Sequence, residues 1–489
     1  MLEQVDTSLF FAFNHFLQEL LPASAVVFLT NQNEYLFLVL ALALIRKRQW
    51  AETARLVALM LVAVAVSDAL GFVLKELIGR ERPCHALEGA RVLVYCGKSF
   101  SMPSNHALNT FTLAGVALFM SKDRLRYAFV VLAALVALTR PIVGVHYPSD
   151  IIAGAALGLA LAWGMVRLHD WVGSLSEERR LTTVLWLILG GMAAFRAYYI
   201  IYGPLDLSPD EAHYWEWTRH PALSYYSKGP MVAWLITLGT AIFGHTEFGV
   251  RVPAIVLSVL SSVLLYMLGR DMYDRRTGFF AAVLYQIIPL FSAYGIVMTI
   301  DPPFMFFWLL ALHQMRRLLR NDTLMNWALL GMIVGTGMLA KYTMAFFIIC
   351  SLCWFVFDRQ KRGHFFKPGP YVGVAFTFVF FSPVLLWNAM NDWVTFRHTS
   401  GHVNLVGGFS FTPDGFVDFT AAQFGLITPV LFVLMVISIL QHRDDERGKF
   451  LFWYSAPVFV FFVLKSLQGK VEANWAMMAY LTGLVALSR

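Results

Sequence analysis

The sequence predicts an all-α protein that crosses a membrane many times. Of its 489 residues, 58% are hydrophobic and only 14% are charged, and the mean hydropathy is +0.62. Apolar runs of about 17–25 residues recur along the chain, and a helix of that length spans the hydrocarbon core of a bilayer. We therefore expect a polytopic fold with about a dozen crossings or more.

The basic residues indicate how these helices are oriented. The net charge is +7, and the basic residues gather in clusters between apolar runs, as in cytoplasmic loops that follow the positive-inside rule. The clusters are at 46–48, 122–126, 179–180, 275–276, 316–320, 359–362 and 443–449. This leaves segments 76–104, 139–149, 203–250, 390–416 and 467–474, with turns at Asp301 and Lys341, on the outer face. The charge is therefore predicted to set topology rather than to bind nucleic acid.

Two of the four cysteines share one predicted outer loop. They are Cys84 and Cys96, and a disulfide is permitted on the oxidising side of a membrane. We therefore hypothesise a Cys84–Cys96 bridge. Cys350 and Cys353 lie inside an apolar run, where packing is a better explanation than metal binding.

A polar joint divides the chain into two regions. Residues 169–180 (HDWVGSLSEERR) separate the apolar blocks 1–168 and 181–489. We interpret 169–180 as a cytoplasmic linker between two domains. The two blocks carry different sets of polar residues and show no internal repeat, so each is expected to have its own function.

Three short segments of the first region carry residues suited to phosphate chemistry. They are 75–83 (KELIGRERP), 103–106 (PSNH) and 140–150 (RPIVGVHYPSD). All three lie at the ends of apolar stretches, so they are predicted to meet at a membrane surface. Together they supply two histidines, a carboxylate and several cations, which can hold a phosphate, attack it and protonate its leaving group.

Each of these residues can be given a role. Asp150 can orient His146 for nucleophilic attack on phosphorus. Ser104 precedes His106 at a predicted helix start, where backbone N–H groups and the hydroxyl can bind phosphate while His106 protonates the leaving oxygen. The cations that neutralise the transferring phosphoryl group are Lys75, Arg82 and Arg140, so no cofactor is expected for this reaction. Taken singly, such residues usually contact water or lipid headgroups; their joint occurrence favours catalysis.

This pattern resembles the type 2 phosphatidic acid phosphatase (PAP2) superfamily over about residues 1–168. The family element K-x6-R-P corresponds to Lys75, Arg82 and Pro83. The element P-S-G-H corresponds to Pro103, Ser104 and His106, and the element S-R-x5-H-x3-D corresponds to Arg140, His146 and Asp150. The resemblance implies a PAP2-type helical bundle that acts as a lipid phosphatase through a phosphorylated His146. Asn105 replaces the usual glycine and Thr139 the usual serine. Asn105 is therefore expected to place a side chain beside the phosphate pocket.

A long outer loop of the second region combines acids, aromatics and a lysine. Residues 205–217 (LDLSPDEAHYWEW) contain Asp210 and Glu211, and 225–230 (YYSKGP) contain Lys228. A carboxylate can act as a general base, aromatic faces suit sugar rings and a lysine suits a lipid phosphate. An aromatic belt at headgroup level has a similar composition. Further polar residues interrupt apolar runs, where charges are costly and usually functional; these are Asp301, Lys341, Arg397, His398 and Glu472.

Residues 181–489 resemble the polyprenyl-phosphate-sugar-dependent glycosyltransferases of the multi-spanning C-type (GT-C) fold. The similar groups are related to protein O-mannosyltransferases and to the aminoarabinose and galacturonic acid transferases of lipid A. The resemblance implies Asp210 as the catalytic carboxylate, with donor or acceptor contacts from Glu211, Lys228, Lys341, Arg397 and His398. Ser227 stands where the aminoarabinose branch has a glutamate, which puts that branch's metal site in question, but a divalent metal stays compatible with the transferase. The region is expected to be C-terminally short.

The two resemblances predict a bifunctional enzyme of a bacterial inner membrane, with both active sites facing the periplasm and lipids as substrates. In the preferred interpretation, the phosphatase removes a lipid A phosphate and the transferase adds a sugar from a polyprenyl-phosphate donor to the exposed hydroxyl. In the alternative, the phosphatase recycles polyprenyl diphosphate and the transferase serves another acceptor. A lipid or sugar transporter with non-catalytic sites is a third hypothesis. Transporters favour midplane charges and paired repeats, which the sequence does not show.

Overall fold

The computed structural model describes residues 2–45, 50–402 and 413–489, and within this part of the chain every regular element is helical. The chain divides into two compact units, Met1–Leu175 and Ser176–Arg489. The basic cluster at 46–48 and part of the predicted outer segment 390–416 lie outside the described residues. The all-α fold expected from the sequence is confirmed.

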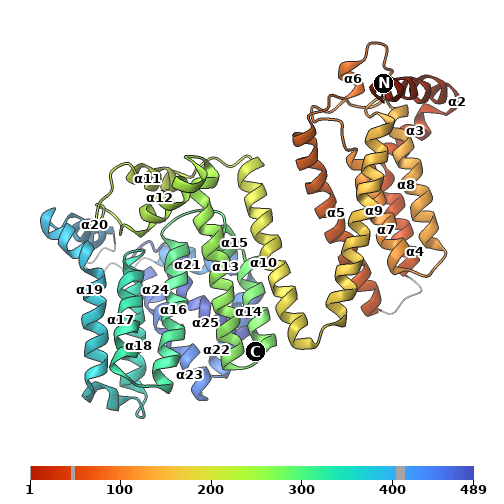
Figure 1. Ribbon diagram of the computed structural model, residues 1–489. Coiled ribbons are helices and arrows are strands. Elements are labelled where there is room, and N and C mark those ends of the chain that lie inside the picture. Colours follow the sequence, from red (N-terminus) through yellow and green to blue (C-terminus); the bar gives the residue numbers. More distant parts are fainter. Residues whose placement is uncertain (1, 46–49, 403–412) are drawn as a thin grey trace. The chain divides into compact units, whose positions relative to one another are not determined.

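The first unit is a bundle of long helices with short N-terminal helices across one end (Figure 1). Its elements are α1 (Leu2–Phe11), η1 (Ala12–Leu17), α2 (Gln18–Leu20), α3 (Ala23–Asn31), α4 (Asn33–Ile45), α5 (Trp50–Ile78), α6 (Pro83–Ala86), α7 (Asn105–Met120), α8 (Leu125–Ile142) and α9 (Pro148–Ser174). Helix α7 is central and packs on α9, α8 and α5.

Glycines bring α7 and α9 into close approach. A Cβ added to Gly154 would lie 2.7 Å from the Ser104 carbonyl oxygen, and one on Gly158 would lie 2.5 Å from that of Leu108. Larger residues there would push the helices apart. At the top of this contact the Ser104 N–H donates to the Asp150 carbonyl at 3.1 Å. The start of α7 is thereby held against the start of α9.

A disulfide closes the loop between α5 and α7. Cys84 and Cys96 are bonded, which confirms the hypothesis drawn from the sequence. The same loop is held to the N-terminal helices, because the Asn14 amide donates to the Arg91 carbonyl at 2.8 Å and to that of Ile142 at 3.0 Å. This loop therefore has fixed contacts on two sides.

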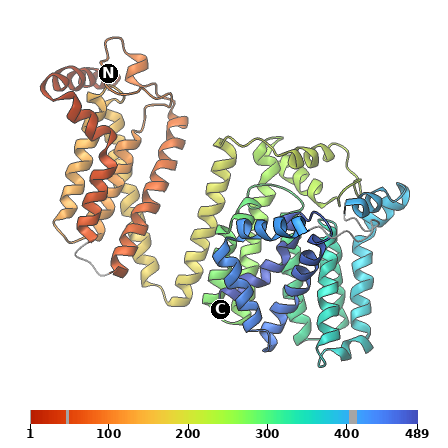
Figure 2. The same cartoon turned by 180° about the vertical axis from the view of Figure 1, so that it is seen from behind.

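The second unit is larger and has its own core. Its elements are α10 (Glu177–Tyr202), α11 (Pro209–Trp217), α12 (Met231–Phe243), α13 (Glu247–Met272), α14 (Arg275–Ile287), α15 (Pro289–Ala293), α16 (Asp301–Arg320), α17 (Leu324–Met338), η2 (Tyr342–Ala345), α18 (Phe346–Phe357), η3 (Arg362–Phe366), α19 (Pro368–Met390), α20 (Val394–His402), α21 (Pro413–Ile427), α22 (Pro429–Gln441), α23 (Glu446–Trp453), α24 (Ala456–Ser466), η4 (Ala473–Ala476) and α25 (Met477–Leu487). Seen from behind, α21–α25 lie side by side within this unit (Figure 2).

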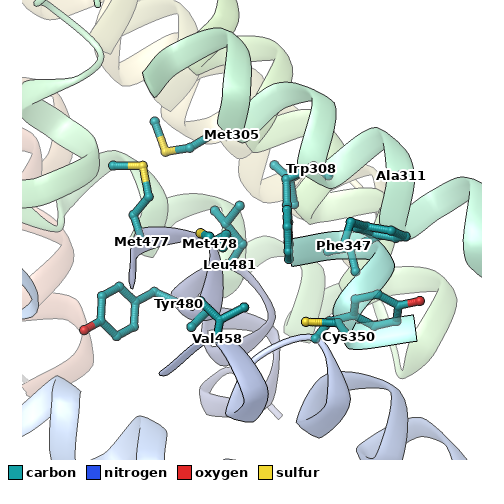
Figure 3. Packing of buried hydrophobic residues seen from close by; sticks show 14 of the residues in the cluster. Met305, Trp308, Ala311, Phe347, Cys350, Val458, Met477, Met478, Tyr480 and Leu481 are labelled. Atoms are coloured by element: carbon teal, nitrogen blue, oxygen red, sulfur yellow. The ribbon is translucent and has the colours of Figure 1, made fainter. Parts of the chain in front are cut away.

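The core of the second unit joins segments distant in sequence. Trp308 of α16 meets Phe347 of α18 edge to face, with ring centroids 5.3 Å apart. Residues of α24 and α25, among them Val458 and Met478, complete the same cluster (Figure 3). Cys350 is buried there as an apolar packing residue. The C-terminal helix is thus integral to this unit.

Several helices have the length and composition of membrane spans. In the described chain seven qualify, or up to nine if each of two bent helix pairs counts as one span. Four shorter apolar segments are Met231–Phe243, Leu324–Met338, Tyr342–Phe357 and Ala473–Leu487. The dozen crossings expected from the sequence would require these shorter segments to cross as well.

The polar joint expected at 169–180 is helical almost throughout. Helix α9 continues to Ser174 and α10 begins at Glu177, so the non-helical break is only Leu175 and Ser176. Glu177 and Glu178 occupy the first turn of α10, where negative charge is favourable.

Candidate active sites

Four helix ends position the phosphate-handling residues of the first unit. Lys75 lies in the last turn of α5 and Arg140 in the last turn of α8. Ser104 is the N-cap of α7, and Pro148 starts α9. The three sequence segments converge because α5 and α8 end on the side of the bundle where α7 and α9 begin.

His146 and Asp150 form the centre of this site. Both are buried, and His146 Nδ1 lies 3.4 Å from Asp150 Oδ2. The same carboxylate oxygen accepts from the Ser101 hydroxyl at 2.5 Å and from the Tyr147 backbone N–H at 2.8 Å. An Nδ1–H facing Asp150 leaves the Nε2 lone pair available. The geometry therefore suits a histidine nucleophile.

Three cations, Lys75, Arg82 and Arg140, act on His146. Lys75 Nζ donates to the carbonyls of Phe100 and Ser101 at 2.7 and 3.1 Å, and Arg82 Nε donates to the Ser99 carbonyl at 2.7 Å. Arg140 is buried, and its Nε has no partner in the described chain.

The Ser104 hydroxyl is likewise buried without a partner. Buried polar atoms without partners are uncommon in native structures. An anion bound among the three cations would satisfy both Arg140 and Ser104.

Burial, with help from the cations, keeps His146 neutral before an anion binds. Burial is the main cause that lowers the pKa of His146 to about 3; Arg140, Lys75 and Arg82 lower it further, and the hydrogen bond to Asp150 opposes them. At neutral pH the imidazole is therefore unprotonated, as nucleophilic attack requires.

Arg80 and Asp6 belong to this site and were not singled out from the sequence. Arg80 Nη1 donates to Asp150 Oδ1 at 2.9 Å and to the Ser149 hydroxyl at 2.7 Å, and its Nη2 donates to Asp6 Oδ2 at 2.6 Å. Arg80 also stacks over the Tyr147 ring at 3.8 Å. Arg80 lies inside the motif segment 75–83, so the sequence could have suggested it as a site residue. Asp6 in α1 lies outside all three motif segments, and the sequence gives no indication of its role.

In the second unit, Glu211 is bound on all sides. It is fully buried, and Arg251 donates to its Oε1 at 2.9 Å and to its Oε2 at 2.8 Å. The backbone N–H groups of Met298 and Ser208 complete the set at 2.9 and 3.0 Å. Burial would raise the pKa of Glu211, but the Arg251 and backbone hydrogen bonds hold it below its usual range. A direct contact with a ligand would require one of these bonds to break.

Asp210, beside it, is exposed at the start of α11. The acidic pair therefore divides into a buried carboxylate that ties α11 to α13 and a carboxylate that faces outward. Sequence reasoning did not foresee Arg251 as the partner of Glu211.

Lys341 and Asp301 form a buried ion pair near Lys228. Lys341 Nζ donates to Asp301 Oδ1 at 2.6 Å, and the Asn474 amide donates to Asp301 Oδ2 at 3.2 Å. Lys228 and Lys341 line one cavity of about 180 Å³ with the aromatic rings of Phe346, Phe461, Phe462 and Trp475. Burial and then Lys341 lower the pKa of Lys228, against the opposing charges of Asp301 and Asp210. An anion in this cavity would relieve the repulsion between the two lysines.

The predicted residues Arg397 and His398 lie on α20, which is held to the loop before Lys228. The Thr395 hydroxyl donates to the Tyr225 carbonyl at 3.0 Å, and the His398 and Tyr226 rings lie 4.9 Å apart. His398 thus joins the aromatic loop, and Arg397 is exposed beside it.

A divalent metal finds no ready set of ligands in the described part of the second unit. Glu211 is already bound by Arg251, and Asp301 by Lys341. Among the described residues, the one group of three potential ligands is Cys84, His85 and Cys96 of the first unit, and its cysteines form a disulfide. The described residues of the second unit thus hold no group of three such ligands.

Two family profiles match the two units. Residues 56–174 match the PAP2 superfamily, and residues 227–387 match the dolichyl-phosphate-mannose-protein mannosyltransferase family. Each match covers part of one unit. We call the first unit the PAP2 unit and the second the transferase unit, after the families that they match.

Curated relatives and a solved structure are similar over part of their length. Lipid A galacturonosyltransferase RgtD of Rhizobium johnstonii is 27% identical over 61% of this chain and 63% of its own length. The undecaprenyl phosphate-alpha-4-amino-4-deoxy-L-arabinose arabinosyl transferase of Pseudomonas aeruginosa is 31% identical over 38% of this chain and 37% of its own. A crystal structure of ArnT from Cupriavidus metallidurans bound to undecaprenyl phosphate is 16% identical, with a TM-score of 0.47, over 63% of this chain and 59% of that one. The chain thus spans less than two thirds of these proteins.

Proposed function

We propose that this protein is a bifunctional lipid-modifying enzyme with a lipid phosphatase site in the PAP2 unit and a glycosyltransferase site in the transferase unit. The observation that carries the proposal is the buried His146–Asp150 pair, surrounded by Lys75, Arg82 and Arg140. Neutral His146 supplies a nucleophile, and the cations supply the charge that a phosphoryl group needs.

The phosphatase reaction takes two steps. In the empty site, burial and then the cations Arg140, Arg82 and Lys75 lower the pKa of His106 to about 3. The bound phosphate dianion offsets these cations, so His106 takes up a proton as the substrate binds. His146 Nε2 then attacks phosphorus, the bond from phosphorus to the lipid oxygen breaks, and His106 protonates that oxygen as it leaves. Asp150 stabilises the charge on the phosphorylated imidazole. Water then attacks the phosphohistidine and gives a proton to His106, which releases inorganic phosphate and restores the site. No cofactor enters either step, because the side-chain cations neutralise the phosphoryl charge.

The transferase reaction uses the exposed half of the acidic pair. Asp210 accepts the proton of an acceptor hydroxyl, the acceptor oxygen attacks the anomeric carbon of the sugar, and the bond from that carbon to polyprenyl phosphate breaks. Lys228 and Lys341 hold the phosphate, and the aromatic wall of their cavity holds the start of the polyprenyl chain. The arabinosyl transferase relatives, whose name specifies undecaprenyl phosphate-linked aminoarabinose, support this donor class.

The preferred coupling is removal of a lipid A phosphate followed by transfer of a sugar to the exposed hydroxyl, in the bacterial inner membrane with both sites facing the periplasm. The lipid A galacturonosyltransferase among the relatives supports this acceptor. A hydroxyl acceptor also gives Asp210 a proton to remove, whereas a phosphate acceptor is already anionic. In the second candidate, the phosphatase recycles polyprenyl diphosphate.

The phosphatase half is tested by release of inorganic phosphate from lipid A, phosphatidate and polyprenyl diphosphate by the purified full chain. We expect His146→Ala to abolish release and the control His169→Ala, near the far end of α9, to retain it. If the wild type hydrolyses none of the three lipids, the phosphatase proposal is wrong.

The transferase half is tested by mass spectrometry of lipid A from cells that express the protein. We expect wild type to remove one phosphate and add one sugar mass, and Asp210→Asn to remove the phosphate only. Asp206→Asn, in the same loop, is the matched control and should behave as wild type. Unchanged sugar addition by Asp210→Asn would refute the assigned base.

A further inference from the structure

A groove in the PAP2 unit leads away from the phosphate pocket. It has a volume of about 880 Å³ and lies between α4, α5 and α7, with Phe129 of α8 at its side. Its walls are mostly apolar, and His106 forms part of its lining. Because His106 is the residue proposed to protonate the leaving oxygen, the groove lies on the leaving-group side.

A polar cluster interrupts the apolar wall beside His106. Asp68 Oδ1 accepts from the amides of Asn105 and Asn109 at 3.1 and 3.2 Å, and Asn109 Oδ1 accepts from the Ser67 hydroxyl at 2.7 Å. Asp68, Asn105 and Asn109 all line the groove. Asp68 Oδ2 accepts no hydrogen bond from the described residues, and Asn105 Oδ1 is buried without a partner. Asp68 is exposed and therefore presents Oδ2 as an acceptor that the cluster does not itself satisfy.

Asp68 lies on α5 among apolar residues. Between Arg55 and Lys75, Asp68 is the one charged residue in an otherwise apolar stretch of α5. A carboxylate at that place is costly and usually has a function.

Gly71 of the same helix leaves room for Asn105, because an added Cβ there would come within 2.5 Å of Asn105 Oδ1. Asn105, which stands where the PAP2 pattern has glycine, is thus built into the groove wall and directed toward Asp68 rather than toward the phosphate pocket.

We propose that Asp68, held in place by Asn105 and Asn109, binds a hydroxyl or amide N–H donor on the leaving group, so that the substrate is a phosphorylated glycolipid whose sugar carries such donors. This inference rests on the proposed phosphatase function. Asp68 is seven residues before Lys75, about 10 Å along the helix, and it is joined through Asn105 to the start of α7 beside His106. Acyl chains would then occupy the apolar walls. A polyprenyl diphosphate offers no N–H donor, and no hydroxyl beyond its phosphates, for this cluster.

The test compares two substrates with the purified full chain in detergent. One is lipid A with its two phosphates, which carries sugar hydroxyl and amide donors, and the other is undecaprenyl diphosphate. For Asp68→Leu we expect kcat/KM on lipid A to fall about 10- to 100-fold, as for a lost hydrogen bond to a charged acceptor, while hydrolysis of undecaprenyl diphosphate changes less than about twofold. Asn109→Leu, a milder change in the same cluster, should shift the ratio in the same direction and serves if Asp68→Leu does not fold.

Glu76→Gln is the matched control, because it removes an exposed carboxylate from the same helix outside the groove. It should leave both substrates unchanged. Equal loss on both substrates, or no loss on lipid A, overturns the inference while the phosphatase function stands. A wild type that hydrolyses only undecaprenyl diphosphate also overturns it. A wild type that hydrolyses neither lipid, nor phosphatidate, refutes the proposed function itself.

Discussion

Replacement of Arg80 by methionine should slow the phosphatase without weakening substrate binding. Arg80 donates to Asp150 Oδ1 at 2.9 Å and to Asp6 Oδ2 at 2.6 Å. It does not belong to the three cations around the histidines, so its effect is to hold Asp150 in place behind His146. Methionine keeps much of the length of the side chain over Tyr147 and removes both charged hydrogen bonds.

The size of the effect follows from these contacts. A hydrogen bond to a charged group contributes about 1.5–3 kcal/mol, and the Arg80 side chain is 22% exposed, which favours the lower end through solvent screening. Asp150 keeps its bonds from Ser101 and Tyr147, so its carboxylate loses one constraint of several. We therefore expect kcat to fall about 10- to 30-fold, since about 1.4 kcal/mol corresponds to a factor of ten in rate, with KM changed less than about twofold.

The assay is steady-state release of inorganic phosphate from the lipid that proves to be the best substrate, with the unfolding temperature measured in parallel. Arg91→Gln is the matched control, because Arg91 pairs with Glu19 at 3.0 Å in an exposed ion pair of the same unit, and such pairs contribute little. Arg80→Lys should recover part of the rate. Wild-type kcat in a folded Arg80→Met protein, or a loss confined to KM, would refute the positioning role.

Three further predictions concern other parts of the chain. Glu211→Gln should lower the unfolding temperature strongly, because breaking a buried ion pair costs about 3–5 kcal/mol. Asp210→Asn should leave the unfolding temperature unchanged and reduce sugar transfer about 100-fold or more. Equal unfolding temperatures for the two variants would contradict the assignment of Glu211 to structure and Asp210 to catalysis. Since the pKa of His146 falls from 6.5 to about 3 on folding, the folded state binds fewer protons between these values, so the free energy of unfolding should decrease as pH falls from about 6.5 toward 3; denaturant titrations should show a flatter profile for His146→Gln. Reduction of the Cys84–Cys96 disulfide should cost about 2–4 kcal/mol of stability in the loop it closes, visible as faster proteolysis there. In Cys84→Ser, which cannot form the bond, cleavage should be fast from the start and should not change when reductant is added.

The sequence was sufficient for the elements whose chemistry is local. Apolar runs predicted helices because a bilayer demands satisfied backbone groups over a fixed length. The motif residues lie at helix ends, and ends that reach the same membrane surface must meet, so Lys75, His106 and His146 could be expected at one end of the bundle. Their catalytic roles stay predictions until the variants are measured.

Contacts between distant segments could not be predicted in this way. Asp210 and Glu211 look alike in sequence, and only the contact of Glu211 with Arg251, forty residues away, distinguishes the buried acid from the exposed one. The pairing of Asp6 with Arg80 depends on an N-terminal helix that crosses the end of the bundle, and nothing near Asp6 signals it. Such partners are set by tertiary packing, which no local pattern encodes.

The charges at each site match the anion that the proposed reaction places there. In the PAP2 unit, four cations (Lys75, Arg80, Arg82 and Arg140) and two carboxylates (Asp6 and Asp150) leave a formal excess of two positive charges when the histidines are neutral. A phosphate monoester carries about two negative charges near neutral pH, so the empty pocket favours a dianion.

The transferase cavity is balanced differently, because Asp301 already pairs with Lys341 and leaves Lys228 as the excess cation. A polyprenyl-phosphate sugar is a phosphodiester with one negative charge, which Lys228 alone can neutralise. When the sugar departs, the phosphate gains a second charge, and Lys341 is within the same cavity to share it with Asp301. Stabilisation that grows as the bond breaks accelerates the reaction, whereas stabilisation already complete in the bound donor does not. In the proposed reaction, the Asp301–Lys341 pair would therefore make a second cation available as negative charge develops on the leaving phosphate.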